Sequence, residues 1–267
     1  MAKIWEELKS ARIIDLSQPM FRGMPQSPNH TPYRMVLDRR HGDMVSPAGG
    51  SASNEIIVTG CHVGTHIDAL AHVSFKGKLC GDIDASSVMS HMGFSELGIE
   101  TVKSFLCRGV FLDIAKLHGL DILPSDYEIT VDDLKAAQIQ AKIEIQEGDV
   151  VLIGSGWAKN WDRRELFQGQ VDGAPGIGES AAIWLAAHKP RACGGETIAF
   201  EHIPAGAGHR ELPVHRLLLV EKGIHIIETM KLTELAESKA VEFLFVLSPL
   251  NLVGATGSPV RPLAVLV

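Results

Sequence analysis

The chain has 267 residues and a mass of 28.9 kDa, which suits one large domain or two small ones and is ample for a packed core. Hydrophobic residues make up 45% and charged residues 21%, the balance of a folded protein rather than a disordered one. A net charge of −7 gives no basic surface for nucleic acid or anionic membrane, and no apolar run is long enough to span a membrane. We therefore expect no nucleic-acid and no membrane partner.

Two features of the sequence bear on the compartment. The first residues, MAKIWEELKSARI, carry charges through the stretch where a signal peptide needs its apolar segment. The four cysteines are widely spaced and form no CxxC pair, so we expect them to be reduced and buried: Cys61, Cys80, Cys107 and Cys193. Both features predict a cytoplasmic protein.

The first third of the chain is dominated by loops. A helix over residues 2–10 and a strand over residues 13–16 lead into a proline-rich loop over residues 19–32. Residues 38–52 form a second loop, charged and then rich in glycine, before a strand over residues 54–59. Such long loops either form the lid or wall of a binding site or are surface loops without a binding role.

The rest of the chain alternates between strands and helices. Thr130 is typical of a helix N-cap, with Asp133 three residues later. The expected elements are strands at 109–113 and 149–154, helices at 131–141 and 179–188, and apolar runs at 217–220, 224–227 and 241–247. The alternation predicts the α/β class. Since we find neither a repeat nor a linker, we expect one domain over residues 13–267 after an N-terminal helical extension, residues 1–12.

The segment CHVGTHIDALAH, residues 61–72, carries the clearest chemical signal. Its polar residues are separated by four, two and four positions: His62, His66, Asp68 and His72. An extended stretch would place these side chains on one side, and a helix beginning near Asp68 is a second possibility for the latter half. In either case imidazoles and a carboxylate converge, a set that holds Zn²⁺, Mn²⁺ or Fe²⁺ with room for a reactive water.

A structural role must be weighed against metal binding for each histidine, because a single histidine is more often a surface or core residue than a ligand. Three histidines and an aspartate within 11 residues, interleaved with small residues, favour a metal site. A second cluster lies near the other end of the chain: His202, His209, His215, His225 and Glu228. Taken individually, its members are interpreted as structural, although His215 and Glu228 flank a helix–strand unit and are able to meet at one end of a sheet.

The stretch Gly154-Ser155-Gly156-Trp157 is interpreted as a turn. A phosphate loop needs a following GK[ST], and a nucleophile elbow needs glycine two residues before the serine, so the stretch matches neither. Trp157 belongs either to the core or to a pocket wall. The same two alternatives hold for Met20, Phe21, Met24 and Phe200, so the substrate-binding residues stay unknown.

The segment from His62 to His72 resembles the HxGTHxDAPxH motif of the cyclase family, which includes bacterial kynurenine formamidases (arylformamidases) and manganese-dependent isatin hydrolases. Similar segments extend the resemblance from about residue 13 to residue 265, at residues 151–157, 175–185, 215–228 and 249–264. The resemblance implies the α/β fold of that family, a swivelling β/β/α-type single domain. It also implies a homo-oligomer, a dimer or tetramer in which neighbouring subunits contribute to the pocket.

The same resemblance implies roles for particular residues. The implied metal ligands are His62, His66, Asp68, His215 and Glu228. The first three would hold one ion, as in the isatin hydrolases with their single Mn²⁺. In the two-zinc formamidases Asp68 would bridge to a second ion, completed by His215 and Glu228. His72 would be the catalytic proton donor and acceptor, and the cofactor would be Mn²⁺ or Zn²⁺, as one or two divalent ions.

This chain departs from the family pattern at three places. Leu70 replaces the motif's proline, at a position expected to shape the turn. The family segment GhDTxSxD reads GGETIAFE at residues 194–201, with both acids lengthened and the serine replaced by alanine. Residues 24–28 lack the substrate-stacking tryptophan of the formamidases, and the longer chain, mainly through residues 38–52, is closer to the isatin hydrolases.

These expectations combine into one hypothesis. The protein is expected to be a metal-dependent hydrolase that cleaves the C–N bond of a small amide or lactam, an arylformamide or a cyclic amide such as isatin. Metal-activated water would attack, with His72 as acid and base. The alternatives are a lactone or ester hydrolase or a lyase on the same metal site, and a metal-binding protein without catalysis. In that last case His72 would close the site as a fourth ligand.

Overall fold

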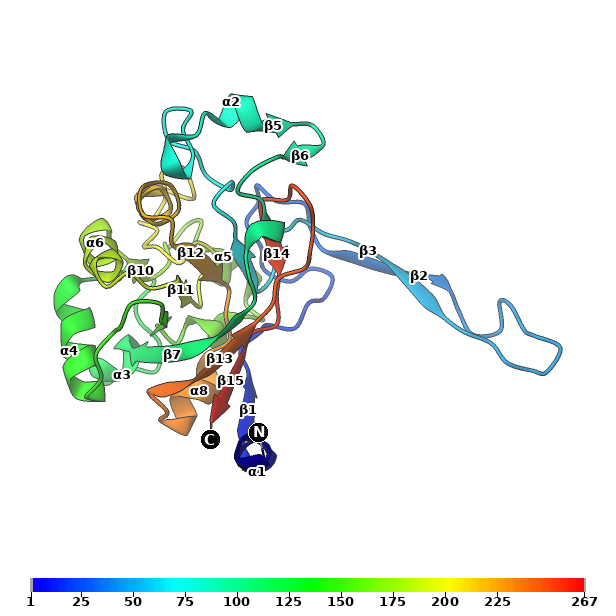
Figure 1. Ribbon diagram of the computed structural model, residues 1–267, viewed down its shortest axis with the longest axis horizontal. Helices are drawn as coiled ribbons and strands as arrows, with labels where there is room; N and C mark the ends of the chain where they lie inside the picture. Colours follow the sequence, from blue (N-terminus) through cyan, green and yellow to red (C-terminus); the bar gives the residue numbers. More distant parts are fainter. Residues whose placement is uncertain (1, 267) are drawn as a thin grey trace.

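The computed structural model describes residues 2–266 and is built around one nine-stranded sheet (Figure 1). Its strands are β1 (Arg12–Asp15), β4 (His66–Asp68), β7 (Phe105–Asp113), β9 (Val150–Gly154), β11 (Ala192–Gly195), β12 (His225–Glu228), β13 (Glu242–Leu247), β14 (Gly257–Pro259) and β15 (Leu263–Leu266). Their order across the sheet is β1-β15-β13-β7-β9-β11-β12-β4-β14. The four central strands β7, β9, β11 and β12 run parallel, and the strands on both flanks are antiparallel to their neighbours.

Helices cover both faces of the parallel strands. The first hydrophobic core lies under α3 (Ile114–Leu117), α4 (Val131–Ala141), α6 (Glu179–Ala187), α7 (Pro213–His215) and the π-helical turn η4 (Arg216–Glu221). The second core lies on the opposite face, where α8 (Thr233–Ser238) packs with the antiparallel strands. Along β9, Val151 and Ile153 belong to the first core and Val150 and Leu152 to the second. Successive side chains of a strand point to opposite faces, so this continuous apolar run fits a strand buried on both sides.

The smaller elements lie around this sheet. The helices are α1 (Ala2–Ser10), α2 (Ala85–Val88) and α5 (Arg164–Gln168), with short 3-10 turns η1 (Cys80–Asp82), η2 (Ile99–Thr101) and η3 (Trp157–Asn160). The short strand pairs are β5 (Met89–Ser90) with β6 (Gly93–Phe94), and β8 (Glu128–Ile129) with β10 (Gly176–Ile177). Within residues 2–266, no helix is long and apolar enough to cross a membrane.

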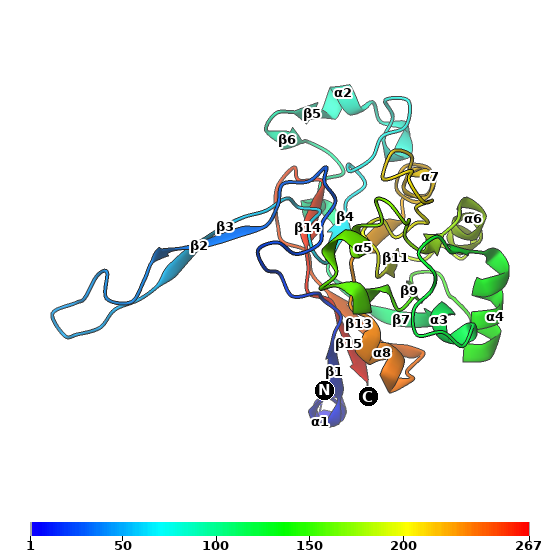
Figure 2. The ribbon, with the colours of Figure 1, turned by 180° about the vertical axis from the view of Figure 1, so that it is seen from behind.

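A two-stranded arm extends away from the body of the molecule (Figures 1 and 2). It consists of β2 (Arg34–Arg39) and β3 (Asn54–Val58), which pair antiparallel with each other in a separate sheet. The pair Met35–Ile57 lies on one face of this ribbon and the pair Val36–Ile56 on the other, and all four side chains are exposed. The arm therefore presents apolar side chains to solvent on both faces.

Several expected elements are confirmed, and others differ for physical reasons. Helix α4 begins after the Thr130 cap, whose hydroxyl accepts from the Asp133 N–H while the Asp133 carboxylate accepts from the Thr130 N–H. The expected loop over residues 38–52 begins later, because residues 38 and 39 continue β2. The stretch 217–220 lies in η4, which agrees with the helical segment expected between His215 and the strand that ends at Glu228. The division of the chain at residue 12 stays a prediction.

The turn at residues 154–157 is confirmed. Gly156 has φ +73°, and a Cβ atom there would lie 2.1 Å from the carbonyl oxygen of Asp121, so only glycine fits. Trp157 is buried in the core, and its indole N–H donates to the Phe167 carbonyl oxygen. All four cysteines are free, but only Cys193 is buried, so the expected burial is wrong for the other three, which are half-buried.

Candidate metal centre

The centre is organised by the pairing of two short strands. In the register between β4 and β12, His66 lies opposite Glu228, and Ile67 lies opposite Ile227. The imidazole Nε2 of His66 is consequently 3.2 Å from Glu228 Oε2 and 3.5 Å from Asp68 Oδ1. The stretch around Asp68 is extended, so the alternative of a helix beginning there is wrong.

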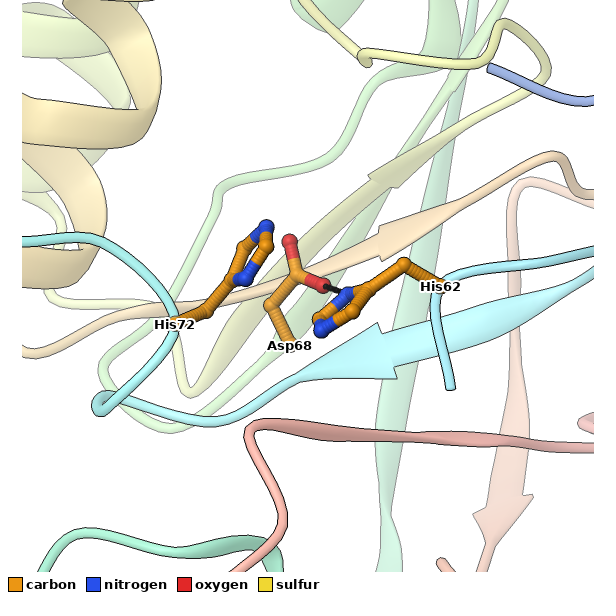
Figure 3. Close-up of side chains that lie close together, drawn as sticks. All are labelled: His62, Asp68 and His72. Atoms are coloured by element: carbon orange, nitrogen blue, oxygen red, sulfur yellow. Dashed lines mark hydrogen bonds and ion pairs between the residues drawn. The ribbon is translucent and has the colours of Figure 1, made fainter. Parts of the chain in front are cut away.

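His62 and His72 approach Asp68 from the turn before β4 and from the loop after it (Figure 3). His62 Nδ1 is 2.7 Å from Asp68 Oδ1, and its Nε2 is 2.9 Å from Thr256 Oγ1. The rings of His62 and His72 are stacked, with centroids 3.7 Å apart. A Cβ atom on Gly257 would lie 2.5 Å from the His62 ring, so this glycine makes room for the imidazole.

The fifth and sixth predicted residues complete the arrangement from distant parts of the chain. Helix α7 brings His215 Nε2 to 3.0 Å from Glu228 Oε1 and 3.7 Å from Asp68 Oδ2. Asp68 thus faces His62 and His66 through Oδ1 and His215 through Oδ2. Within residues 2–266, two combinations bring one donor atom of each residue within 4.8 Å of the others: His62, Asp68 and His72, and His66, Asp68 and Glu228.

The donors are buried, and some of them lack hydrogen bonds of normal geometry. His66 is 2% exposed, Asp68 0% and Glu228 4%. Among the described residues, His66 Nε2, Asp68 Oδ2 and Glu228 Oε1 are inaccessible to solvent and form no hydrogen bond of normal geometry, although His66 Nε2 and His215 Nε2 lie 3.2 Å and 3.0 Å from the two oxygens of Glu228. A buried polar atom without a partner costs about 1–3 kcal/mol. Imidazole nitrogen and carboxylate oxygen are ligands of Zn²⁺ and Mn²⁺, so these residues fit a divalent cation.

The charges of the site favour a cation as well. Burial would raise the pKa of Asp68, but the imidazoles of His72, His62 and His66 outweigh it and hold that pKa well below its usual range. Burial and Asp68 also oppose ionisation of Glu228, yet His215 and His66 keep its pKa low. Two buried carboxylates are therefore ionised near neutral pH, and a divalent cation matches their charge.

The two outer histidines differ in their ionisation. Burial lowers the pKa of His72 to about 3, although the charge of Asp68 opposes the shift, so the ring is neutral at pH 7. Burial would also lower the pKa of His215, but its interactions with the carboxylates of Glu201 and Glu228 raise that pKa well above the ordinary value. His215 is thus held in place by negative charge on two sides.

Two half-buried histidines near the centre, His30 and His209, were not among the site residues expected from the sequence. His30, from the proline-rich loop, stacks on His62 with centroids 5.3 Å apart and lies 6.4 Å from His72. His209 Nδ1 is 3.1 Å from Ser27 Oγ, so the loops carrying His30 and His209 contact each other. No local spacing relates His30 to the motif, and a glycine-rich setting favoured a structural interpretation of His209.

The other members of the second histidine cluster are structural. The Nδ1 of His225 donates to the backbone oxygen of Asp68 at 2.8 Å, which holds the motif strand in place. His202 is bonded instead to the backbone oxygen of Asp126. Of the side chains considered for an aromatic pocket, Met24, Trp157 and Phe200 are buried in the cores, while Phe21 is exposed and packs edge-on against Trp161.

This fold and this arrangement of histidines and carboxylates define a family of proteins. The Cyclase family model, described as "Putative cyclase", matches residues 14–202, and the chain belongs to this family. A crystal structure of a novel cyclase superposes with a TM-score of 0.86 at 29% identity, over 98% of this chain and 89% of that one. The predicted α/β single domain of the cyclase family is thereby confirmed.

Named relatives give two further comparisons. "Cyclase-like protein 3" of Oryza sativa subsp. japonica is 26% identical over 215 residues, 80% of this chain and 66% of the rice protein. "Isatin hydrolase" of Roseibium aggregatum is 26% identical over 211 residues, 78% of this chain and 73% of that protein. An isatin hydrolase structure with the product analogue thioisatinate has a TM-score of 0.77 at 20% identity, over 99% of this chain and 97% of that chain, and this likeness concerns the fold.

Proposed function

We propose that this protein is a metal-dependent hydrolase that opens a carbon–nitrogen amide bond in a small arylformamide or cyclic amide. The observation that carries the proposal is the set of buried donor atoms on His66, Asp68 and Glu228 that form no hydrogen bond of normal geometry, next to the half-buried imidazole of His72. The relative named isatin hydrolase supports a cyclic amide of the isatin type as the first substrate to test.

We assign the metal ligands from the residues that surround the two carboxylate oxygens of Asp68. His62 and His66 face its Oδ1 and His215 faces its Oδ2, while Glu228 contacts both His66 and His215. We assign these five residues as the ligands of one or two Mn²⁺ or Zn²⁺ ions. Such an ion supplies Lewis acidity and an activated water when it is bound.

His72 is assigned as the proton-transfer residue. It is less buried than the assigned ligands, and its ring stacks on His62 beside Asp68. A neutral imidazole beside the reacting water takes a proton from that water and returns it to the leaving nitrogen. His30 and His209 are half-buried residues of two loops that contact each other, and His30 stacks on His62.

We also propose that the protein is a homo-oligomer. A two-stranded ribbon by itself is marginally stable in water, and this arm is apolar on both faces. A contiguous apolar surface of this kind is typical of a protein–protein contact. A second copy of the chain covering the arm removes the exposed side chains of Met35, Val36, Ile56 and Ile57 from water.

The cytoplasm is the proposed compartment. The four free cysteines lie in four separate parts of the chain. Free thiols persist in reducing compartments, where disulfides are rare.

The test of the proposed activity is hydrolysis of isatin and of N-formylkynurenine, followed by absorbance. The protein is first stripped with a chelator and then reconstituted with Mn²⁺ or Zn²⁺, with a chelated sample and His66→Ala as controls. We expect turnover of one of the two compounds that depends on the added metal. If neither compound is hydrolysed by metal-loaded protein, or if turnover survives in His66→Ala, the proposal is wrong.

A further inference from the structure

Glu201 is a buried carboxylate next to the centre to which the proposed function gives no role. Its side chain is 1% exposed. Its backbone is held closely against Gly176, where a Cβ atom would lie 2.2 Å from the Glu201 carbonyl carbon. A side chain at position 176 would therefore displace the Glu201 backbone, and the glycine allows Glu201 to occupy this place.

The carboxylate of Glu201 accepts hydrogen bonds from the start of helix α7. Its Oε2 accepts from the Val214 N–H at 3.0 Å, and its Oε1 accepts from the His215 N–H at 3.0 Å. Oε1 also lies 2.6 Å from Nδ1 of the His215 ring. The first turn of a helix has free N–H groups and a partial positive charge, which favour a carboxylate. One side chain thus holds both the backbone and the imidazole of His215.

The bond at Nδ1 decides which nitrogen of His215 faces the centre. When the neutral ring donates its Nδ1 hydrogen to Glu201, its Nε2 carries the lone pair. That Nε2 lies between Glu228 Oε1 and Asp68 Oδ2. His66 is anchored in the same way, but by a backbone oxygen, with Nδ1 2.8 Å from the Gly64 carbonyl. A bond to a carboxylate is stronger than one to a neutral carbonyl, so the two histidines are held unequally.

We propose that Glu201 is a positioning residue that orients His215 and strengthens divalent-cation binding by Asp68, His215 and Glu228. This inference rests on the proposed function, because it takes His215 as a ligand. Carboxylates behind metal-binding histidines fix the ring and raise its basicity, and their loss weakens metal binding by about 10- to 100-fold. The side of the centre formed by His62 and His66 does not depend on Glu201.

Two substitutions separate the charge of Glu201 from its shape. Glu201→Gln has nearly the same volume and retains one acceptor for His215, but removes the negative charge. Glu201→Ala removes the acceptors as well. The matched control is Glu196→Gln, because Glu196 is equally buried and its Oε2 accepts from the N–H groups of Ser155 and Gly156 without contacting any assigned ligand.

The experiment measures zinc affinity rather than activity. Chelator-stripped wild type and variants are titrated with Zn²⁺ in competition with a chromophoric chelator, and circular dichroism checks the fold of each. In Glu201→Ala we expect one zinc-binding event to weaken by about 10- to 100-fold, and in Glu201→Gln by a smaller factor. Glu196→Gln should bind zinc as the wild type does.

Each other result has a distinct meaning. If folded Glu201→Gln and Glu201→Ala both bind zinc as tightly as the wild type, Glu201 only caps α7 and the inference is overturned. If Glu196→Gln is weakened as much as Glu201→Gln, the effect is not specific to His215, and the inference is also overturned. If Glu201→Ala does not fold, Glu201→Gln decides alone. If wild-type protein binds no zinc, the proposed function itself has failed.

Discussion

Asp68 is the residue on which the centre converges. It is fully buried, and its two oxygens face different imidazoles from different parts of the chain. Such a carboxylate is costly to bury unless its charge is compensated. The surrounding histidines compensate part of it, and a bound cation would compensate the rest.

We predict that Asp68→Asn loses its metal. The amide keeps the size of the side chain but removes the charge on which both sides of the centre depend. We expect metal affinity to fall by more than about 100-fold, beyond the effect of losing an outer partner. Elemental analysis after dialysis against Zn²⁺ checks this, and stoichiometric zinc in the variant would refute the assignment.

His72→Ala separates the two roles open to His72. A proton-transfer residue is not needed to hold the ion, so the variant should retain its metal while turnover falls by about 10²- to 10⁴-fold. Metal content and rate are measured on the same sample. Loss of the ion would identify His72 as a fourth ligand, and unchanged turnover would remove it from the mechanism.

At the scale of elements, helix α4 illustrates a feature that local sequence encodes well. Its capping box involves neighbours in the chain, so the pattern Thr130–Asp133 is sufficient to place the helix start. Burial opposes ionisation of Asp133, but hydrogen bonds from Thr130, His118 and Tyr127 lower its pKa overall. The stabilisation from a lowered carboxylate pKa is complete above the unfolded-state value and is lost as the pH falls through the folded-state value.

Thr130→Ala should therefore lower the free energy of unfolding by about 1 kcal/mol at pH 7. The deficit should shrink in acid, because the hydrogen bonds from Thr130 help to keep Asp133 ionised. Urea unfolding at pH 7 and near pH 3 measures both values, with Thr130→Ser as the control that keeps the hydroxyl. An equal deficit at both pH values would contradict the assigned link to Asp133.

Only part of the metal centre can be predicted from local sequence patterns. The motif from His62 to His72 is contiguous, so its chemistry can be read directly from spacing. The opposition of His66 and Glu228 depends instead on the pairing of β4 with β12, and neither spacing nor periodicity encodes a pairing between such distant strands. Strand β11, ACGG, lacks the branched residues that mark a strand and was not predicted.

In the molecule as a whole, the two-stranded arm formed by β2 and β3 extends away from the compact body (Figures 1 and 2). The loop expected over residues 38–52 is confirmed at the tip of the arm. The sequence pattern does not show that the apolar strands on either side of this tip form an exposed ribbon. Whether a strand is exposed depends on which surfaces the rest of the chain covers. When both faces of a strand are apolar, the period of its hydrophobic residues does not indicate whether either face is exposed. Family membership and the central sheet, by contrast, follow from the long motifs and apolar runs.

We predict that the double variant Val36→Asp/Ile57→Asp dissociates the oligomer. The two positions lie on opposite faces of the arm, so charge is placed in any contact that covers either face. Light scattering coupled to size-exclusion chromatography should show wild type larger than the variant. Ile139→Asp, at an exposed isoleucine on α4, is the control. A monomeric wild type would contradict the proposed oligomer.

The proposed function requires a divalent cation bound to the carboxylate of Asp68 and to the histidines around it. Anomalous diffraction from crystals soaked in Zn²⁺ or Mn²⁺ tests it most directly, because it locates the ion independently of any substrate. We expect an anomalous peak about 2.0–2.2 Å from an Asp68 oxygen and from at least one of the imidazoles of His62, His66 and His215. A metal-soaked crystal with no peak at Asp68, or with a peak only at other residues, would contradict it.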